Sequence, residues 1–264
     1  MWALRHPEDA ARVPISKGWE DARAVLALWA AAAAIVTAHV LPPEVLAVVG
    51  VAAVHGGLIA AALSWGGIGL AEASLAVALL ALARAVVAVH PYGAVAYLAV
   101  PLWLGRLAWR GRLTRLGLTP LWPWGAVVVG AMVGCALALH LVTSASRTLG
   151  YGVRVDPRVL LPSLGYDLGA NVLSAELFFR GAVMQHLWRR WSFGSALAAA
   201  TAAATLRYCV DPYVGTIELR VGAAVYMGLL ALLNGALYRW SGSLLPGLVA
   251  ASVFFACCRL LAIG

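Results

Sequence analysis

The chain has 264 residues, of which 63% are hydrophobic and 11% are charged, and it carries a formal net charge of +8. Soluble globular proteins contain about 25% charged residues, so a soluble fold of this length could not cover its surface with polar side chains. This composition excludes a soluble enzyme, a nucleic-acid-binding domain and a disordered chain, and it predicts an integral membrane protein.

Long stretches without charged residues predict an all-α fold of eight or nine transmembrane helices. A helix needs about 20 mostly apolar residues to cross a bilayer. The stretch 92–105 is short and contains Pro101, so it could be re-entrant, and the count would then be eight. With Pro, Gly and Trp residues taken as boundaries, the predicted helices are 24–41, 45–64, 68–89, 92–105, 123–144, 166–187, 194–210, 221–239 and 242–261.

Three regions of the chain differ in charge and apolarity. Residues 1–23 are rich in charge and are predicted to form a cytoplasmic N-terminal segment. The apolar run that follows begins too late and is too long for a typical cleaved signal peptide. The Arg-rich segment 106–122 closes a group of N-terminal helices, residues 24–122, and separates it from a C-terminal helical core, residues 123–264.

The basic residues indicate the orientation of the helices, because cytoplasmic loops carry an excess of Lys and Arg and Trp gathers at membrane interfaces. A cytoplasmic N-terminus with nine crossings leaves few basic residues outside, namely Arg147, Arg154, Arg158 and Arg220, with Arg259 near the outer end of the last helix. The same orientation puts most Trp residues on the inner side, together with Arg5, Arg12, Lys17, Arg23, Arg106, Arg110, Arg112, Arg115, Arg189, Arg190 and Arg239.

Few ionisable side chains fall within the predicted helices, where a charge costs about 2.5 to 3.5 kcal/mol at the helix centre. Glu176 and Arg180 lie four residues apart on one helix, so their side chains can form an ion pair. Such a pair could have a function or could only hold two helices together. The other candidates are Glu72, Arg84, Asp167, Arg207 and Arg259, with His39, His55, His90, His140 and His186 as milder cases.

The sequence around this pair contains a longer pattern. Residues 174–181 read SAELFFRG, residues 188–191 read WRRW, and residues 240–247 read WSGSLLPG. Over roughly 160–258 the chain resembles the CAAX protease and bacteriocin-processing family of intramembrane endopeptidases. That family carries a Glu-Glu-x-x-x-Arg motif, a Phe-x-x-x-His motif and, after a Gly-Ser step, a His-x-x-x-Asn motif.

The resemblance also implies that most of the catalytic groups are missing. The family's first Glu, which activates water, corresponds to Ala175, while the second Glu and the Arg remain as Glu176 and Arg180. By spacing, the second motif falls on residues 203–207 and the third on residues 251–255. The expected His, His and Asn then correspond to Arg207, Ala251 and Phe255, which with Ala175 form the candidate cleft.

These departures predict a CAAX-protease-like membrane protein that is catalytically impaired and that binds or regulates a membrane-anchored peptide or partner protein. One alternative is an active intramembrane endopeptidase that uses Glu176 and Arg180. Another is a transporter or channel component in which Glu72 and Arg84 mark a proton or solute path. Membrane lipid is the expected environment, in a bacterial plasma membrane, and no nucleic-acid partner is predicted.

The cysteines and histidines suggest two further kinds of chemistry. Cys209 lies two residues after Arg207, and with a histidine such as His140 it could act in transpeptidation, although a buried cysteine is usually inert. The histidines of the predicted helices share no ligand spacing, so no metal site is predicted. No cofactor is predicted either.

Overall fold

The computed structural model describes residues 17–38, 40–119, 123–153, 157–209 and 217–263. These residues are mostly helical, which confirms the predicted all-α class. The regular β-structure among them is one short antiparallel pair, β1 (Tyr151–Val153) and β2 (Leu261–Ile263), with Tyr151 opposite Ile263. Most of the predicted N-terminal segment 1–23 lies outside the described residues, as do Arg5, Arg12, His39 and Arg154.

The helices form two compact units. The N-terminal unit consists of the described residues within Val13–Pro120 and Val155–Phe178, and the C-terminal unit of those within Leu121–Arg154 and Phe179–Gly264. One continuous helical run, residues 157–188, contributes to both units, because the boundary falls between Phe178 and Phe179. The division of the chain into residues 24–122 and 123–264 stays a prediction from the sequence.

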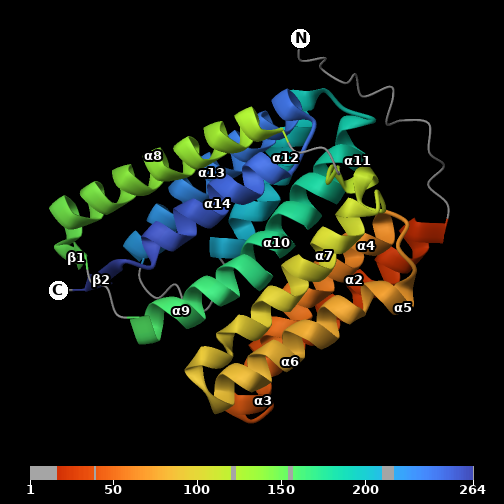
Figure 1. The fold of residues 1–264 in the computed structure, drawn as a ribbon, viewed down its shortest axis with the longest axis horizontal. Coiled ribbons are helices and arrows are strands. Elements are labelled where there is room, and N and C mark those ends of the chain that lie inside the picture. The colour runs from red at the N-terminus through yellow and green to blue at the C-terminus, as the bar shows by residue number, and fades with distance from the viewer. Residues whose placement is uncertain (1–16, 39, 120–122, 154–156, 210–216, 264) are drawn as a thin grey trace. The chain divides into compact units, whose positions relative to one another are not determined.

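The N-terminal unit contains most of the elements coloured red to yellow in Figure 1. Its elements are α2 (Lys17–Thr37), α3 (Pro43–Gly50), η1 (Val51–Gly56), α4 (Gly57–Trp65), α5 (Leu70–Ala73), α6 (Leu75–Val89), η2 (Pro91–Leu98), α7 (Ala99–Trp109), η3 (Thr114–Leu116), α9 (Pro157–Tyr166), η4 (Asp167–Asn171) and α10 (Val172–Ala175). Here η denotes 3₁₀-helical turns in η2 and η3 and π-helical turns in η1 and η4.

Helix α4 forms the centre of this unit, because every residue from Gly57 to Ser64 is buried. The preceding turn packs closely on α6, since a Cβ atom at Gly56 would lie only 2.8 Å from the Cα atom of Val77. Small residues allow helix backbones in membranes to approach in this way. The position of Gly56 therefore sets the distance between η1 and α6.

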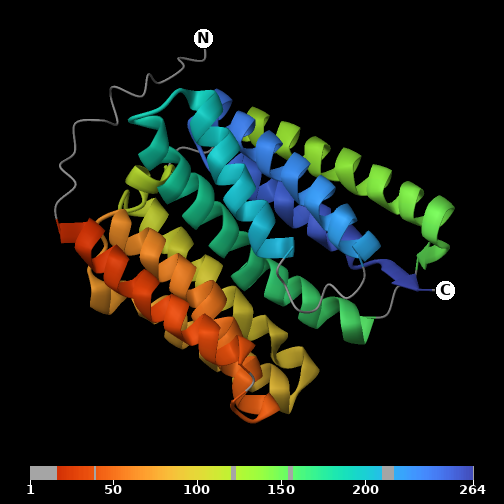
Figure 2. The same cartoon turned by 180° about the vertical axis from the view of Figure 1, so that it is seen from behind.

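The C-terminal unit contains α8 (Trp124–Leu149), most of η5 (Glu176–Met184, π-helical), α11 (Gln185–Trp188), α12 (Phe193–Cys209), α13 (Ile217–Ser241) and α14 (Leu245–Cys258). Helices α8, α13 and α14 run side by side in both ribbon views (Figures 1 and 2). A Cβ atom at Gly130 or Gly134 of α8 would clash with the carbonyl oxygen of Pro246 or Ala250 in α14. Glycines one turn apart therefore allow this close helix contact.

Helix occurs at the position of each of the nine predicted helices, among the residues that the structure describes. Four segments are long and apolar enough to cross a membrane, namely Pro43–Trp65, Leu70–Val89, Trp124–Thr148 and Arg220–Ser241, and Leu245–Cys258 is a shorter apolar helix. A count of eight or nine crossings therefore stays a prediction. The stretch predicted as 92–105 is helical through Pro101 because this proline lies in the first turn of α7, where an N–H group is not required.

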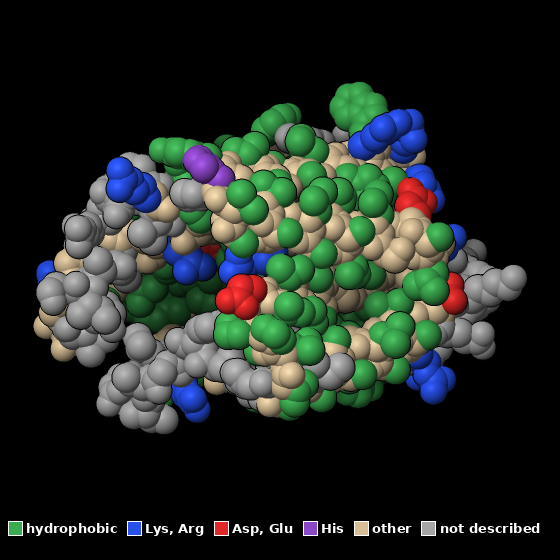
Figure 3. Space-filling model, turned by 90° about the horizontal axis from the view of Figure 1, so that it is seen from below, with side chains coloured by type: hydrophobic (Ala, Val, Ile, Leu, Met, Phe, Trp, Pro, Cys, Tyr) green, Lys and Arg blue, Asp and Glu red, His purple; other side chains and the backbone are tan. Residues whose placement is uncertain are grey.

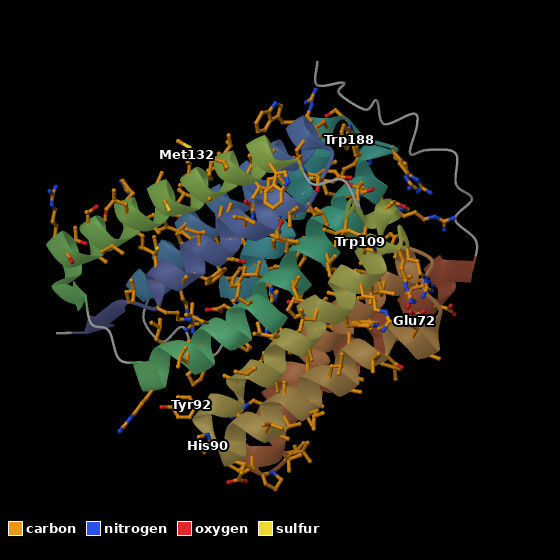
Figure 4. All side chains as sticks on the ribbon, viewed as in Figure 1. Glu72, His90, Tyr92, Trp109, Met132 and Trp188 are labelled. Atoms are coloured by element: carbon orange, nitrogen blue, oxygen red, sulfur yellow. The ribbon has the colours of Figure 1, made fainter. Side chains whose placement is uncertain are left out.

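Large apolar side chains are exposed on both units. Leu102 in α7 is 73% exposed, and Met132 in α8 is 64% exposed and points outward from its helix (Figure 4). Apolar side chains are also spread over the middle of the face in Figure 3, between stretches of backbone and other side chains. Soluble monomeric proteins rarely expose large contiguous apolar patches, whereas lipid tails solvate them.

Candidate functional site

Glu176 and Arg180 both belong to the helical run 157–188, and each residue is only 3% exposed. The run changes from α-helical to π-helical hydrogen bonding at η4 and again at η5, which begins at Glu176. π-Helical turns are rare and frequently mark functional sites. Glu176 lies in the N-terminal unit and Arg180 in the C-terminal unit, so their ion pair stays a prediction.

A buried chain of hydrogen bonds lies beside the motif in the N-terminal unit. Ser174, directly before Ala175, is fully buried, and its hydroxyl oxygen lies 2.9 Å from Nδ1 of His55 in η1. The same hydroxyl donates to the backbone oxygen of Asn171 at 2.9 Å. The other ring nitrogen of His55, Nε2, lies 2.5 Å from the hydroxyl oxygen of Tyr166.

The Ser174 hydroxyl fixes the direction of one of these hydrogen bonds. Its single proton is used on Asn171, so Nδ1–H of His55 donates to the Ser174 oxygen. His55 is buried, with 5% exposure, and both of its ring nitrogens have a hydrogen-bond partner. The chain connects η1 to α9 and α10, the part of the motif helix that carries Ala175.

Ring and amide contacts extend this buried cluster. The Tyr166 ring lies edge-on to His55 and to Tyr97, with centroids 5.1 and 6.0 Å apart. Asn171 donates from Nδ2 to Asp167 Oδ1 at 3.1 Å, and Asp167 is 1% exposed. Asp167, a candidate from the sequence, is therefore hydrogen-bonded within the same helical run.

Sequence reasoning identifies His55 only as an intramembrane histidine and misses its partners. His55 is separated by 119 residues from Ser174 and by 111 from Tyr166, and no periodic pattern relates such distant positions. The available signal is the presence of Ser174, a small polar residue in an apolar helix directly before the motif. The presence of Ser174 does not predict which helix supplies the hydrogen-bond partner of its hydroxyl.

Two of the candidate cleft positions contact a common ring in the C-terminal unit. The guanidinium carbon of Arg207 lies 5.0 Å from the centre of the Tyr208 ring, and that ring lies 6.0 Å from the ring of Phe255. Ala251, one turn before Phe255 on α14, is buried with 3% exposure. The assembled groups are a guanidinium, aromatic rings and a methyl group, where the family motifs have imidazoles and an amide.

The aromatic cluster continues through Phe254 to a polar pair on α8 and α13. Phe255 contacts Phe254 with ring centroids 5.7 Å apart, and Phe254 stacks on Tyr226 of α13 at 6.4 Å. The Tyr226 hydroxyl lies 2.8 Å from Nδ1 of His140 in α8. His140 therefore has a hydrogen-bond partner that connects α8 to α13.

Glu72, a candidate for a proton or solute path, forms an ion pair at the end of α5. Its two carboxylate oxygens accept from Arg112 at 2.6 and 2.7 Å, and the two side chains are 33% and 42% exposed. Figure 4 shows Glu72 near the loop that follows α7. The pair connects the Arg-rich segment to α5, and Arg84 lies three turns further along, in α6.

The structure also bears on the cysteine and metal alternatives. Cys209 is a free thiol of intermediate exposure at the end of α12. Among the described residues, no group of three or more His, Cys, Asp or Glu side chains is arranged to hold a metal ion.

The apolar helices and their exposed apolar surface identify the chain as an α-helical integral membrane protein. The profile of the type II CAAX prenyl endopeptidase Rce1-like family matches residues 157–256, so this part of the chain is similar to that family. The match includes all six candidate positions between Ala175 and Phe255 and confirms the resemblance found in the sequence. No curated protein and no solved structure matches the chain.

Proposed function

We propose that this protein is a catalytically impaired member of the CAAX prenyl endopeptidase family that binds a membrane-anchored peptide or partner segment without cleaving it. The observation that carries the proposal is the identity of four side chains at motif positions: Ala175, Arg207, Ala251 and Phe255. By the resemblance, these positions hold the water-activating Glu, two His and an Asn in the family.

The chemistry of peptide hydrolysis explains why these replacements matter. The reaction needs a base that removes a proton from water and donors that face the oxyanion as it develops. The methyl groups of Ala175 and Ala251 and the ring of Phe255 can do neither, and Phe255 packs against Tyr208 and Phe254. When several members of a catalytic unit are lost, the remaining members do not restore the rate.

The two remaining motif residues support a binding role. Glu176 and Arg180 are buried charges on one helical run, and a guanidinium is well suited to hold a peptide carboxylate by paired hydrogen bonds. The exposed apolar surface of both units suits a ligand that is itself anchored in the bilayer. We place this activity in a bacterial plasma membrane, as the sequence predicts.

The test uses purified full-length protein in lipid nanodiscs with a fluorescent, lipid-anchored peptide that ends in a free carboxylate. We expect the peptide to bind and to stay intact, and we expect Arg180→Gln to weaken binding by about tenfold, the effect of losing a hydrogen bond to a charged group. Arg147→Gln, which changes an exposed arginine at the end of α8, is the matched control and should bind normally.

A second variant tests whether the four departures from the family's motif residues cause the expected lack of cleavage. The combined variant Ala175→Glu, Arg207→His, Ala251→His and Phe255→Asn restores the family's residues and should gain measurable cleavage. Cleavage by the unmodified protein that disappears in Glu176→Ala would overturn the proposal and support an active endopeptidase. Absence of both cleavage and peptide binding would also contradict it.

A further inference from the structure

Three arginines and several aromatic residues gather at one end of the C-terminal unit. Trp188 ends α11, Arg189, Arg190 and Trp191 follow it, and Phe193 begins α12. At the end of α13, Arg239 and Trp240 complete the group. We call these residues, Trp188, Arg189, Arg190, Trp191, Phe193, Arg239 and Trp240, the arginine–tryptophan collar.

The ring of Phe193 holds the collar together. The Trp188 ring meets it edge-on with centroids 4.9 Å apart, and the guanidinium carbon of Arg239 lies 4.5 Å from its centre. Trp188, Phe193 and Tyr238 also pack on the buried cluster of Met184, Ala196 and Ala200. Helices α11, α12 and α13 therefore meet at one apolar base, where Figure 4 labels Trp188.

The positive charge of the collar has little compensation among the described residues of its own unit. Arg189 acts electrostatically on both Tyr238 and His186, and Arg190 acts on His186. Among the residues of this unit whose side chains the structure describes, none is Asp or Glu.

Arg189 also lacks one hydrogen-bond acceptor. Its Nε atom is buried and makes no hydrogen bond among the described residues. A partly buried guanidinium N–H that lacks an acceptor is costly, and an anionic oxygen satisfies it best. Arg190 precedes Phe193 in the chain, and Arg239 contacts the ring of Phe193. The exposed side chains of both arginines supply further donors.

We propose that the arginine–tryptophan collar binds the phosphate group of an anionic membrane phospholipid. Guanidinium groups recognise phosphate oxygens through paired hydrogen bonds, and basic pockets between helix ends bind lipid headgroups. Trp191 and Trp240, which are 51% and 40% exposed, are suited to the interface between headgroups and lipid tails. The site is separate from the catalytic motif positions and does not depend on the proposed function.

The binding experiment compares phosphatidylglycerol with phosphatidylcholine on the full-length protein. Native mass spectrometry counts the lipids retained after mild detergent extraction, and thermal melts with added short-chain lipid report binding to the folded state. We expect retention and stabilisation to favour phosphatidylglycerol. The triple variant Arg189→Gln, Arg190→Gln and Arg239→Gln should bind it about 100-fold more weakly, from about fivefold for each arginine.

Matched variants separate a specific site from general charge. Arg147→Gln removes an exposed arginine from the same unit and should retain the lipid preference. Replacing the three collar arginines by lysine keeps the charge but removes the paired guanidinium hydrogen bonds, so this variant should fold and retain only part of the preference. It also controls for misfolding of the glutamine variant.

Three outcomes would overturn the proposal. The first is equal retention of both lipids by the unmodified protein. The second is a loss in Arg147→Gln as large as in the triple variant. The third is competition by millimolar inorganic phosphate without any preference for phosphatidylglycerol, which would identify free phosphate as the ligand of these arginines instead of a lipid headgroup.

Discussion

At the scale of single residues, two polar features are buried where a bilayer protein rarely tolerates them. His55 lies between Ser174 and Tyr166 and connects η1 to the motif helix. Glu176 and Arg180 place opposite charges four positions apart on that helix, and both are buried. The contribution of both features to the free energy of unfolding depends on hydrogen bonds or charge pairs. Removing one of the two partner residues loses that interaction.

A double-mutant cycle on His55 and Ser174 measures the first feature. The coupling energy between His55→Ala and Ser174→Ala should be about 0.6 kcal/mol and at most about 1.7 kcal/mol, the range for side-chain hydrogen bonds between membrane helices. Unfolding by SDS in mild detergent gives the free energies. His140→Ala with Ser174→Ala is the control pair, and its effects should add, since His140 is hydrogen-bonded to Tyr226 and Ser174 to His55. Additive losses for His55 and Ser174 would contradict the hydrogen bond.

A second cycle tests whether Glu176 and Arg180 form an ion pair. Replacing Arg180 alone by Leu leaves a buried carboxylate without its predicted partner and should cost about 3 to 5 kcal/mol. The double variant Glu176→Leu and Arg180→Leu should be more stable than that single variant. The same SDS titration provides the comparison, and strictly additive losses would show that the two charges do not pair.

At the scale of elements, close helix contacts depend on glycine at particular positions. In α8, Gly130 and Gly134 face the backbone of α14, with no room for a Cβ atom. In α13, Gly222 has no atom within 4 Å of the position that a Cβ would occupy. The same substitution should therefore have opposite effects in the two helices.

Replacing Gly134 by Ala should destabilise the protein by about 1 to 3 kcal/mol, because the new methyl group forces α8 away from the carbonyl oxygen of Ala250. Replacing Gly222 by Ala is the matched control and should stabilise the helix by about 0.5 to 1 kcal/mol. Thermal melts of the two variants check the prediction. Equal effects of the two substitutions would show that the α8–α14 contact is looser than described.

At the scale of the whole molecule, the arginine distribution predicts that the N-terminus and residues 106–115 face the cytoplasm. Arg110 is exposed in the loop after α7 and Arg147 is exposed at the end of α8, on the predicted outer side. In a background in which the native cysteines are replaced, Arg147→Cys should react with an impermeant maleimide added to intact cells. Arg110→Cys should react only after the cells are opened. Labelling of Arg110→Cys from outside would reverse the topology.

Composition by itself determines that this protein is an α-helical membrane protein, because its few charged residues cannot cover a soluble surface and a bilayer requires internally satisfied backbone. The positions of the helices also follow from local apolar stretches, and the motif around Glu176 indicates the family whose profile matches residues 157–256. The tertiary structure alone decides that His55 reaches Ser174 and that Glu72 pairs with Arg112. In an Ala-rich chain, apolar faces look alike all round each helix, so the sequence carries no periodic signal for which helices meet. Those contacts are decided by backbone approach at glycines and by hydrogen bonds between residues far apart in the chain.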